Sequence, residues 1–259
     1  MAKIGDNNPR AFGDTVSLDA WRTPFDGKTG LADLHVQVVF SDGRIGGVDA
    51  PVRFRLQLRR AEVHVLRDAA QVLQIRSSSV NAGANPGRER TVTSTLETEV
   101  STKAGVTLSQ TPIAELGKQK KHLLKQEVVT KDDGQSIAFV SMRVDDGYVF
   151  RVSSESELLE GVPWDSSHPL LSYSDAAAPR NRGEPPELRV ELRCRREDMR
   201  IYDIELTNSH DSLANYSANK IMAVEQYIKS ELINTGFMVG DITDPFSQII
   251  LADVSPVEE

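Results

Sequence analysis

The sequence contains a single cysteine, Cys194, among 259 residues. One cysteine cannot form a disulfide within the chain, and its place in an alternating run predicts a small buried side chain rather than a reactive thiol. The sequence also lacks an apolar run close to the ~20 residues of a membrane-spanning helix, and it lacks the pattern of a signal peptide. We therefore expect a soluble, cytoplasmic protein held together by a hydrophobic core.

Positive charge is in deficit, with 30 Lys and Arg residues against 38 Asp and Glu residues and a formal net charge of -8. General affinity for nucleic acid or for anionic membranes is not expected, because both attract cationic surfaces. Chemical motifs are also scarce, and the five histidines share no metal-ligand spacing. The sequence predicts no catalytic residue and no cofactor.

Alternation of apolar and polar residues is the dominant pattern, and two segments share it in detail. Residues 52–65 and 188–201 both alternate, reach an Arg-Arg pair followed two positions later by an acid, and then resume alternation in the opposite phase. The phase change favours a β-bulge that bends each strand from one sheet into another, rather than a tight turn. Two interpretations stay open: an internal repeat of residues 34–65 and 170–201, or unrelated strands with a common pattern.

These patterns predict a mainly β protein, α+β by content, built as an antiparallel β-sandwich with a C-terminal helix packed on it. We divide the chain into an irregular N-terminal segment (1–33), a sandwich domain (34–208) and a C-terminal helical segment (209–259). The long helix follows from the apolar stripe of Ile221, Val224, Ile228 and Leu232. Shorter helices are expected at residues 154–160, from a capping box, and after Asp244-Pro245.

A long amphipathic stretch fills residues 91–130, where apolar residues and threonines alternate with polar ones from Val92 to Leu108. It can be a core strand, an assembly arm, or a hairpin that resembles the membrane hairpin of β-barrel pore-forming proteins. The return strand, residues 123–130, fits the membrane hairpin poorly because neither of its faces is cleanly apolar.

Arginines occupy the polar positions of the two repeated strands. Eight guanidinium groups on related strands can bind phosphate or an acidic partner through planar, bidentate contacts. The alternative is that they pair with Asp and Glu across the sheet. The candidate binding residues are Arg53, Arg55, Arg59, Arg60, Arg189, Arg193, Arg195 and Arg196.

Acidic loop residues are weaker candidates for a hard cation or a small ligand. Asp26, Asp165, His168 and Asp175 can lie at one end of a sandwich. Asp and Ser also start turns by accepting backbone hydrogen bonds, and we favour that interpretation.

The function predicted from these features is a non-enzymatic binding or assembly protein that forms oligomers. Its expected partner is protein, including a second copy of the chain, contacted through strand edges, the 91–130 arm or the terminal helix. One alternative is a β-barrel pore-forming protein that uses residues 91–130 and would meet a membrane. The other is a ligand- or metal-binding enzyme with an unrecognised site in the Asp and His loops.

Overall fold

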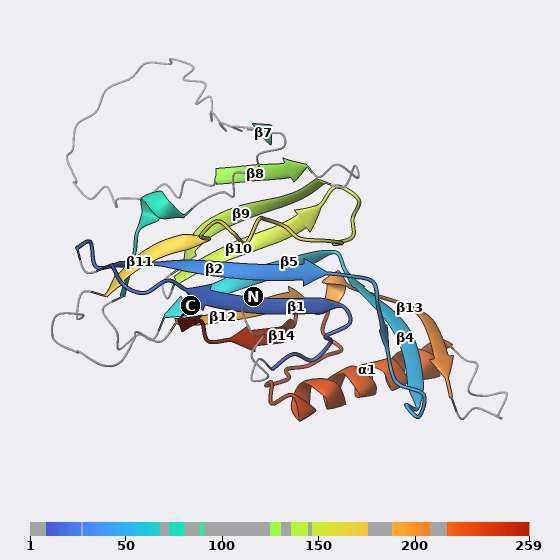
Figure 1. The fold of residues 1–259 in the computed structure, drawn as a ribbon. Coiled ribbons are helices and arrows are strands. Elements are labelled where there is room, and N and C mark those ends of the chain that lie inside the picture. Colours follow the sequence, from blue (N-terminus) through green and yellow to red (C-terminus); the bar gives the residue numbers. More distant parts are fainter. Residues whose placement is uncertain are drawn as a thin grey trace, which may run out of the picture.

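The computed structural model is built mainly of strands, which form a five-stranded, a seven-stranded and a three-stranded sheet (Figure 1). It describes residues 9–26, 28–67, 73–80, 89–90, 125–130, 136–144, 147–175, 188–207 and 217–258. The packed antiparallel sheets and the helix near the C-terminus confirm the predicted sandwich with a C-terminal helix.

The sheets are listed here in the order in which their strands pair. The five-stranded sheet contains β15 (Val257–Glu258), β1 (Val16–Arg22), β2 (Leu31–Phe40), β11 (Leu171–Asp175) and β6 (Leu73–Ile75). The seven-stranded sheet contains β14 (Gln248–Val254), β12 (Leu188–Arg195), β5 (Arg60–Arg67), β10 (Gly147–Ser154), β9 (Ser136–Val144), β8 (Lys125–Thr130) and β7 (Glu89–Arg90). The three-stranded sheet contains β13 (Met199–Leu206), β4 (Val52–Leu58) and β3 (Gly43–Ile45). The other elements are the 3-10 turns η1 (Ser77–Ser79) and η2 (Arg196–Asp198) and the helix α1 (Ser217–Asn234).

The hydrophobic core lies between the five-stranded and seven-stranded sheets. Alternate residues of β2 and β5 are buried, because period-2 alternation puts one set of side chains on the inner face. Trp164 joins the two layers: its indole Nε1 donates to the Val36 carbonyl of β2 at 2.7 Å, and its ring lies 5.4 Å from that of Phe139 and 6.1 Å from that of Phe150. Cys194 is buried in this core as expected.

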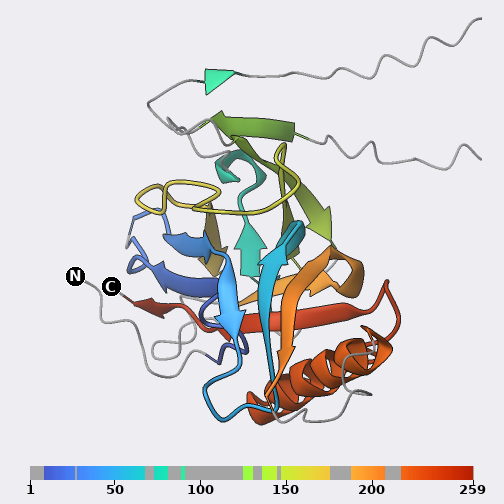
Figure 2. The same cartoon turned by 90° about the vertical axis from the view of Figure 1, so that its right-hand side faces the viewer.

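The two segments with the shared pattern cross between sheets and pair with each other (Figure 2). The first passes from β4 in the three-stranded sheet into β5 in the seven-stranded sheet, and the second passes from β12 in the seven-stranded sheet into β13 in the three-stranded sheet. Antiparallel ladders join β5 to β12 and β4 to β13. The predicted bend between sheets is therefore present in both segments, whereas the duplication itself stays a prediction.

The two bends differ in their local structure. In the first, only Arg59 lies outside the strands, a one-residue irregularity that shifts the buried positions from even to odd numbers. In the second, the strand is interrupted by the 3-10 turn η2, so the bulge predicted there is wrong. The turn buries Asp198, and the Asp198 carbonyl accepts a hydrogen bond from the Arg59 N–H at 2.8 Å. The two bends are thus bonded to each other.

Helix α1 packs on the three-stranded sheet with the predicted stripe. Val224, Ile228 and Leu232 are buried, while Ile221, at the start of the stripe, is half exposed. The Tyr227 ring meets the Phe54 ring of β4 edge to face, with centroids 5.9 Å apart. One face of the three-stranded sheet is therefore covered by helix.

Two further expectations about local structure are wrong. The segment 1–33 is not irregular throughout, because Val16, Leu18 and Ala20 alternate with polar residues and form the buried side of β1. Residues 155–160 form turns rather than a helix, and Glu157 has a positive φ of 65°, which ends helical geometry.

Among the described residues of the C-terminal segment, α1 is the only α-helix, because the second predicted helix is the strand β14. Its apolar run from Ile249 to Val254 pairs antiparallel with β12, and a short apolar run cannot be assigned to helix or strand from its pattern alone. The Asp244-Pro245 pair makes a turn instead: the Asp244 carboxylate accepts the Phe246 N–H at 3.0 Å.

The amphipathic arm lies mostly outside the described residues. Within them, β8 pairs with β9 and β9 pairs with β10, both antiparallel. Residues 91–124 are outside the described part of the chain. In that part, no helix has both the length and the apolar character needed to cross a bilayer.

Candidate functional site

A pocket of about 380 Å³ opens at the bend, on the side of the seven-stranded sheet that faces away from the core. Four arginines from β5, β10 and β12 are among its lining residues: Arg60, Arg151, Arg193 and Arg195. Val140 and Met142 of β9 supply an apolar wall, and both are half-buried. We call this the bend pocket.

The register of the strands brings these side chains together. Arg151 of β10 stands opposite Glu62 of β5, and Glu62 stands opposite Arg193 of β12. Side chains at paired positions project to the same face, so an arginine, a glutamate and an arginine follow one another across three strands. The pairing of β12 with β14 shifts register between Leu192 and Arg193, and such irregularities re-aim the side chains beside them.

Carboxylates hold most of these guanidinium groups at the margin of the pocket. Glu62 accepts from Arg151 Nε at 2.8 Å, and Glu191 accepts from Arg193 Nε at 2.6 Å. Arg195 and Arg60 are held more loosely, by Glu197 at 3.4 Å and by Asp198 at 3.5 Å. Their side chains are 47% and 68% exposed, so both can turn toward a ligand.

Four arginines and two carboxylates, Glu62 and Asp198, line the pocket. Two further carboxylates, Glu191 and Glu197, pair with arginines of the pocket from outside its lining, so neither sign of charge is in clear excess. An anion would therefore be attracted by the two exposed, loosely held arginines rather than by a net positive charge.

The ionisable groups of the pocket respond to these neighbours. A hydrogen bond with His64, whose Nε2 lies 3.0 Å from Glu62 Oε2, lowers the pKa of Glu62 to about 2, and Arg151 adds to this effect. Burial raises the pKa of Asp198, against the opposing effect of Arg60. Burial also raises the pKa of the Cys194 thiol.

The eight predicted arginines separate into three groups. Arg60, Arg193 and Arg195 line the bend pocket. Arg53, Arg55 and Arg59 lie along the β4 side of the bend: Arg53 donates to the carbonyls of Gly47 and Val48, and Arg55 donates to Asp42. Arg189 pairs with Asp253 at 2.7 Å, and Arg196 pairs with Glu225 of α1 at 3.6 Å.

Sequence reasoning missed Arg151, which reaches the pocket from β10. Nothing in the sequence shows that its strand, β10, lies beside β5. The two lining carboxylates did carry a signal, because Glu62 and Asp198 are the acids two positions after the two Arg-Arg pairs.

The weaker acidic candidates are not brought together as a metal site. The Asp26 carboxylate accepts from the Lys28 N–H at 3.0 Å and from the Thr29 hydroxyl at 2.7 Å, and these bonds lower its pKa. Asp165 accepts from the Ser167 N–H at 2.9 Å and lies 3.4 Å from His168 Nδ1. Both act as turn formers, and the side chain of Asp175 lies outside the described residues. Within the described residues, no three His, Cys, Asp or Glu side chains form a group that could hold a metal ion.

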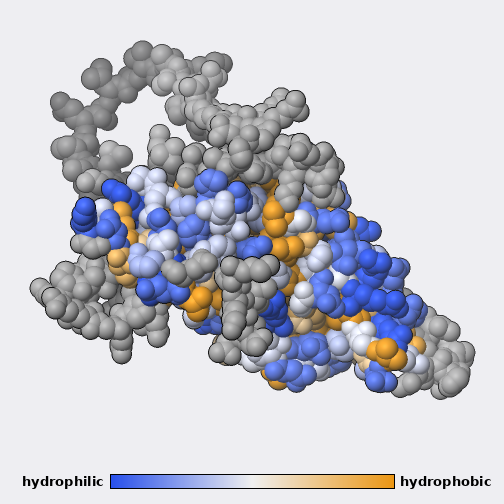
Figure 3. All heavy atoms as spheres, viewed as in Figure 1, coloured by the Kyte–Doolittle hydropathy of each residue, from blue (hydrophilic) through white to orange (hydrophobic). Residues whose placement is uncertain are grey.

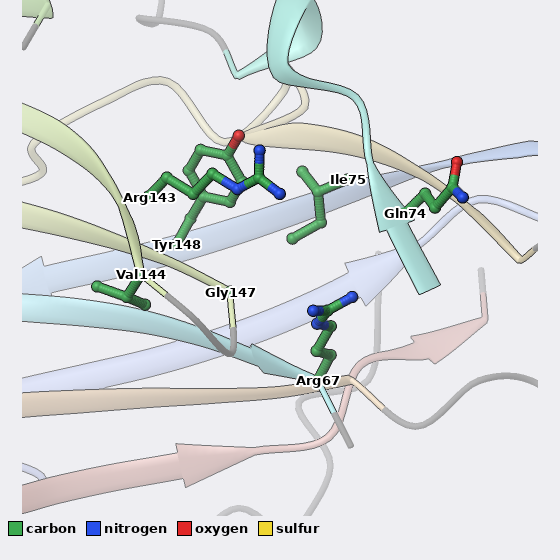
Figure 4. A pocket seen from close by; sticks show the side chains of 7 residues that line it. All are labelled: Arg67, Gln74, Ile75, Arg143, Val144, Gly147 and Tyr148. Carbon is green, nitrogen blue, oxygen red and sulfur yellow. The ribbon is translucent and has the colours of Figure 1, made fainter. Parts of the chain in front are cut away.

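A second hollow, of about 290 Å³, lies at the opposite end of β10 (Figure 4). Arg143 and Tyr148 are cross-strand partners on β9 and β10, and Arg67 of β5 reaches toward the same space. Gly147 is required there, because a Cβ at this position would lie 1.9 Å from the Val65 carbonyl oxygen. With two arginines in its lining against four, this hollow is the weaker candidate for anion binding.

No known protein family matches this chain, and no curated protein is similar to it.

Proposed function

We propose that the chain is a non-enzymatic binding protein and that the bend pocket receives an anionic group of its ligand. The observation that supports this proposal is that four arginines, from three strands, line one hollow, and that two of them have exposed, loosely held side chains. Guanidinium groups bind carboxylate and phosphate oxygens through paired hydrogen bonds, which are stronger than hydrogen bonds between neutral groups.

The chemistry of the lining favours binding over catalysis. A general base works best when its pKa lies near the working pH, and the pKa of Glu62, at about 2, is far below neutrality. A nucleophilic cysteine must ionise, whereas burial raises the pKa of Cys194 and keeps it a thiol. Glu62 therefore serves mainly to position Arg151.

The wall of the pocket narrows the class of ligand. Val140 and Met142 place half-buried apolar surface beside Arg151, which stands opposite Val140. A ligand with a carboxylate or phosphate at one end and a short apolar portion at the other satisfies both surfaces. The volume of about 380 Å³ is within the range of small-molecule sites.

Isothermal titration calorimetry with inorganic phosphate, acetate and hexanoate tests the proposal. We expect hexanoate to bind more tightly than acetate, because each buried CH₂ contributes about 0.8 kcal/mol. The double variant Arg60→Gln/Arg195→Gln should weaken binding at least about tenfold, since a hydrogen bond to a charged group is worth roughly 1.5–3 kcal/mol. Arg44→Gln, an exposed arginine of β3 outside the pocket, is the matched control.

Two outcomes count against the proposal. One is the absence of a binding signal for all three anions at millimolar concentrations in low salt. The other is equal loss of affinity in the control and in the double variant, which would place the anion elsewhere on the surface. Both variants should keep the wild-type melting temperature, because their guanidinium groups are exposed and contribute little to folding.

A further inference from the structure

The three-stranded sheet has one face that no described element covers, opposite to helix α1. Buried Phe54 points to the helix side of β4, so its neighbour Arg55 projects to the other side. The register places Arg44 of β3, Arg55 of β4 and Tyr202 of β13 in one row across the sheet. We call this the open face.

Hydrogen bonds and ring contacts hold the open face in one arrangement. Asp42 accepts from Arg55 Nη2 at 2.5 Å and from the Tyr202 hydroxyl at 2.6 Å. The guanidinium groups of Arg55 and Arg200 lie 5.8 Å and 5.1 Å from the centre of the Tyr202 ring. A surface that is already ordered loses little side-chain freedom when a partner binds.

Arginines outnumber carboxylates on the open face. Arg44, Arg55 and Arg200 lie there with two carboxylates, Asp42 and Glu205, and Arg44 pairs with Glu205 at 3.3 Å. In the space-filling view the end of the molecule formed by β4 and β13 is largely hydrophilic (Figure 3). Such a face is suited to an acidic partner rather than to an apolar one.

An acidic loop lies next to this face on the same molecule. Residues 155–160, which follow β10, include the exposed side chains of Glu155, Glu157 and Glu160. The Leu159 N–H donates to the Leu58 carbonyl, the last residue of β4, at 2.7 Å, and this bond fixes the loop at the bend. One surface therefore carries a basic face and an acidic loop side by side.

We propose that two copies of the chain associate through this surface, with the acidic loop of each copy on the open face of the other. A two-fold symmetric interface uses the same patch on both subunits, so the patch must be complementary to itself. A basic face beside an acidic loop meets that condition. Because each copy is negative overall, the contact works against long-range repulsion, and we expect association in the micromolar range.

Charge reversal with analytical ultracentrifugation tests this interface. Arg44→Glu/Arg200→Glu places two acidic faces against acidic loops, and Glu155→Lys/Glu157→Lys/Glu160→Lys places basic loops against basic faces. Each variant alone should weaken the dimer at least about tenfold. Mixed together, the two variants should form a heterodimer, because one contact keeps the native charges and the other carries both reversals.

The controls separate this proposal from a folding defect and from the bend pocket. Arg143 of β9 lies opposite Tyr148, at the end of β10 that is far from the bend, so Arg143→Glu should leave the dimer unchanged. Circular dichroism should show folded protein for every variant, and anion binding in the pocket should persist in the monomeric variants. A wild-type monomer across the micromolar range, or a dimer that withstands both reversals, would overturn the proposal. Loss of the dimer without rescue in the mixture would also overturn it.

Discussion

The bend pocket and the open face are built from the same sequence pattern, yet they place their arginines differently. In the pocket, guanidinium groups from separate strands surround a hollow and are held by carboxylates that are buried or half-buried, such as Glu191 and Glu62. On the open face they lie around one tyrosine ring and one half-buried carboxylate, Asp42. The difference teaches that alternation places arginines on a face, whereas the pairing of the strands decides which of them lie together.

Removal of a carboxylate should destabilise the two regions to different extents, and this is the largest effect that we expect. Glu191 is 2% exposed and is shared by Arg189 and Arg193, so Glu191→Ala leaves two guanidinium groups without this partner. We expect a loss of about 3 kcal/mol in the free energy of unfolding, measured by urea denaturation. Glu205→Ala on the open face should cost less than about 1 kcal/mol, because its pair is exposed. Equal losses of unfolding free energy in Glu191→Ala and Glu205→Ala would show that burial of the carboxylate does not distinguish the two regions.

Acid should act on the pocket through Glu62 and on the open face through Asp42, whose pKa is also lowered. The folded-state pKa of Glu62 is about 2, below its ordinary value of 4.5, so ionised Glu62 stabilises the folded state. This contribution is complete above the unfolded pKa and is lost as the pH falls from about 5 to about 2. We expect it to be on the order of 2 kcal/mol near neutral pH.

Urea denaturation of the wild type and of Glu62→Gln at neutral pH and near pH 3 measures this contribution. The difference between the two proteins should be largest at neutral pH and should shrink in acid. Glu205→Gln is the control and should differ little from the wild type at either pH. If the difference in unfolding free energy between the wild type and Glu62→Gln stayed constant with pH, Glu62 would not be held as the carboxylate partner of His64 and Arg151.

The strands of the fold were more predictable from sequence than the site. The two bends follow from a local rule, because a change of phase in the alternation must move the buried positions to the other parity, as happens at Arg59. The pocket depends on non-local pairing, since Arg151 meets Glu62 only through the ladder between β10 and β5. No local pattern records which strands become neighbours.

Short apolar runs caused the main errors in secondary structure. The residues of β14 read equally well as helix or strand until their pairing with β12 is known. The segment before β2 was assigned as irregular because its glycines, prolines and acids masked the short alternation of β1. In both places tertiary contacts, rather than local preference, decided the structure.

An ion pair between helix α1 and the turn η2 should make a smaller contribution to the free energy of unfolding. Arg196 of η2 pairs with Glu225 of the helix at 3.6 Å, and both side chains are largely buried. Glu225→Gln should lower the free energy of unfolding by about 1 kcal/mol, since it removes the charge but keeps the shape. The same substitution at Glu205 is again the control. If Glu225→Gln also weakened anion binding in the pocket, the helix would be shown to position η2 and its neighbour Arg195.

The smallest effect on stability is expected on the open face, where the change should appear in a titration instead. The hydrogen bond from Tyr202 to Asp42 raises the pKa of Tyr202, and burial raises it further. Asp42→Asn removes the negative charge, so the pKa of Tyr202 should fall toward the usual value of about 10. NMR titration of ¹³C-labelled tyrosine follows this change, and Tyr202→Phe identifies its signal among the five tyrosines. An unchanged pKa in Asp42→Asn would show that Tyr202 is not held by this carboxylate. The arginines of the open face would then be independent surface side chains rather than parts of one ordered arrangement.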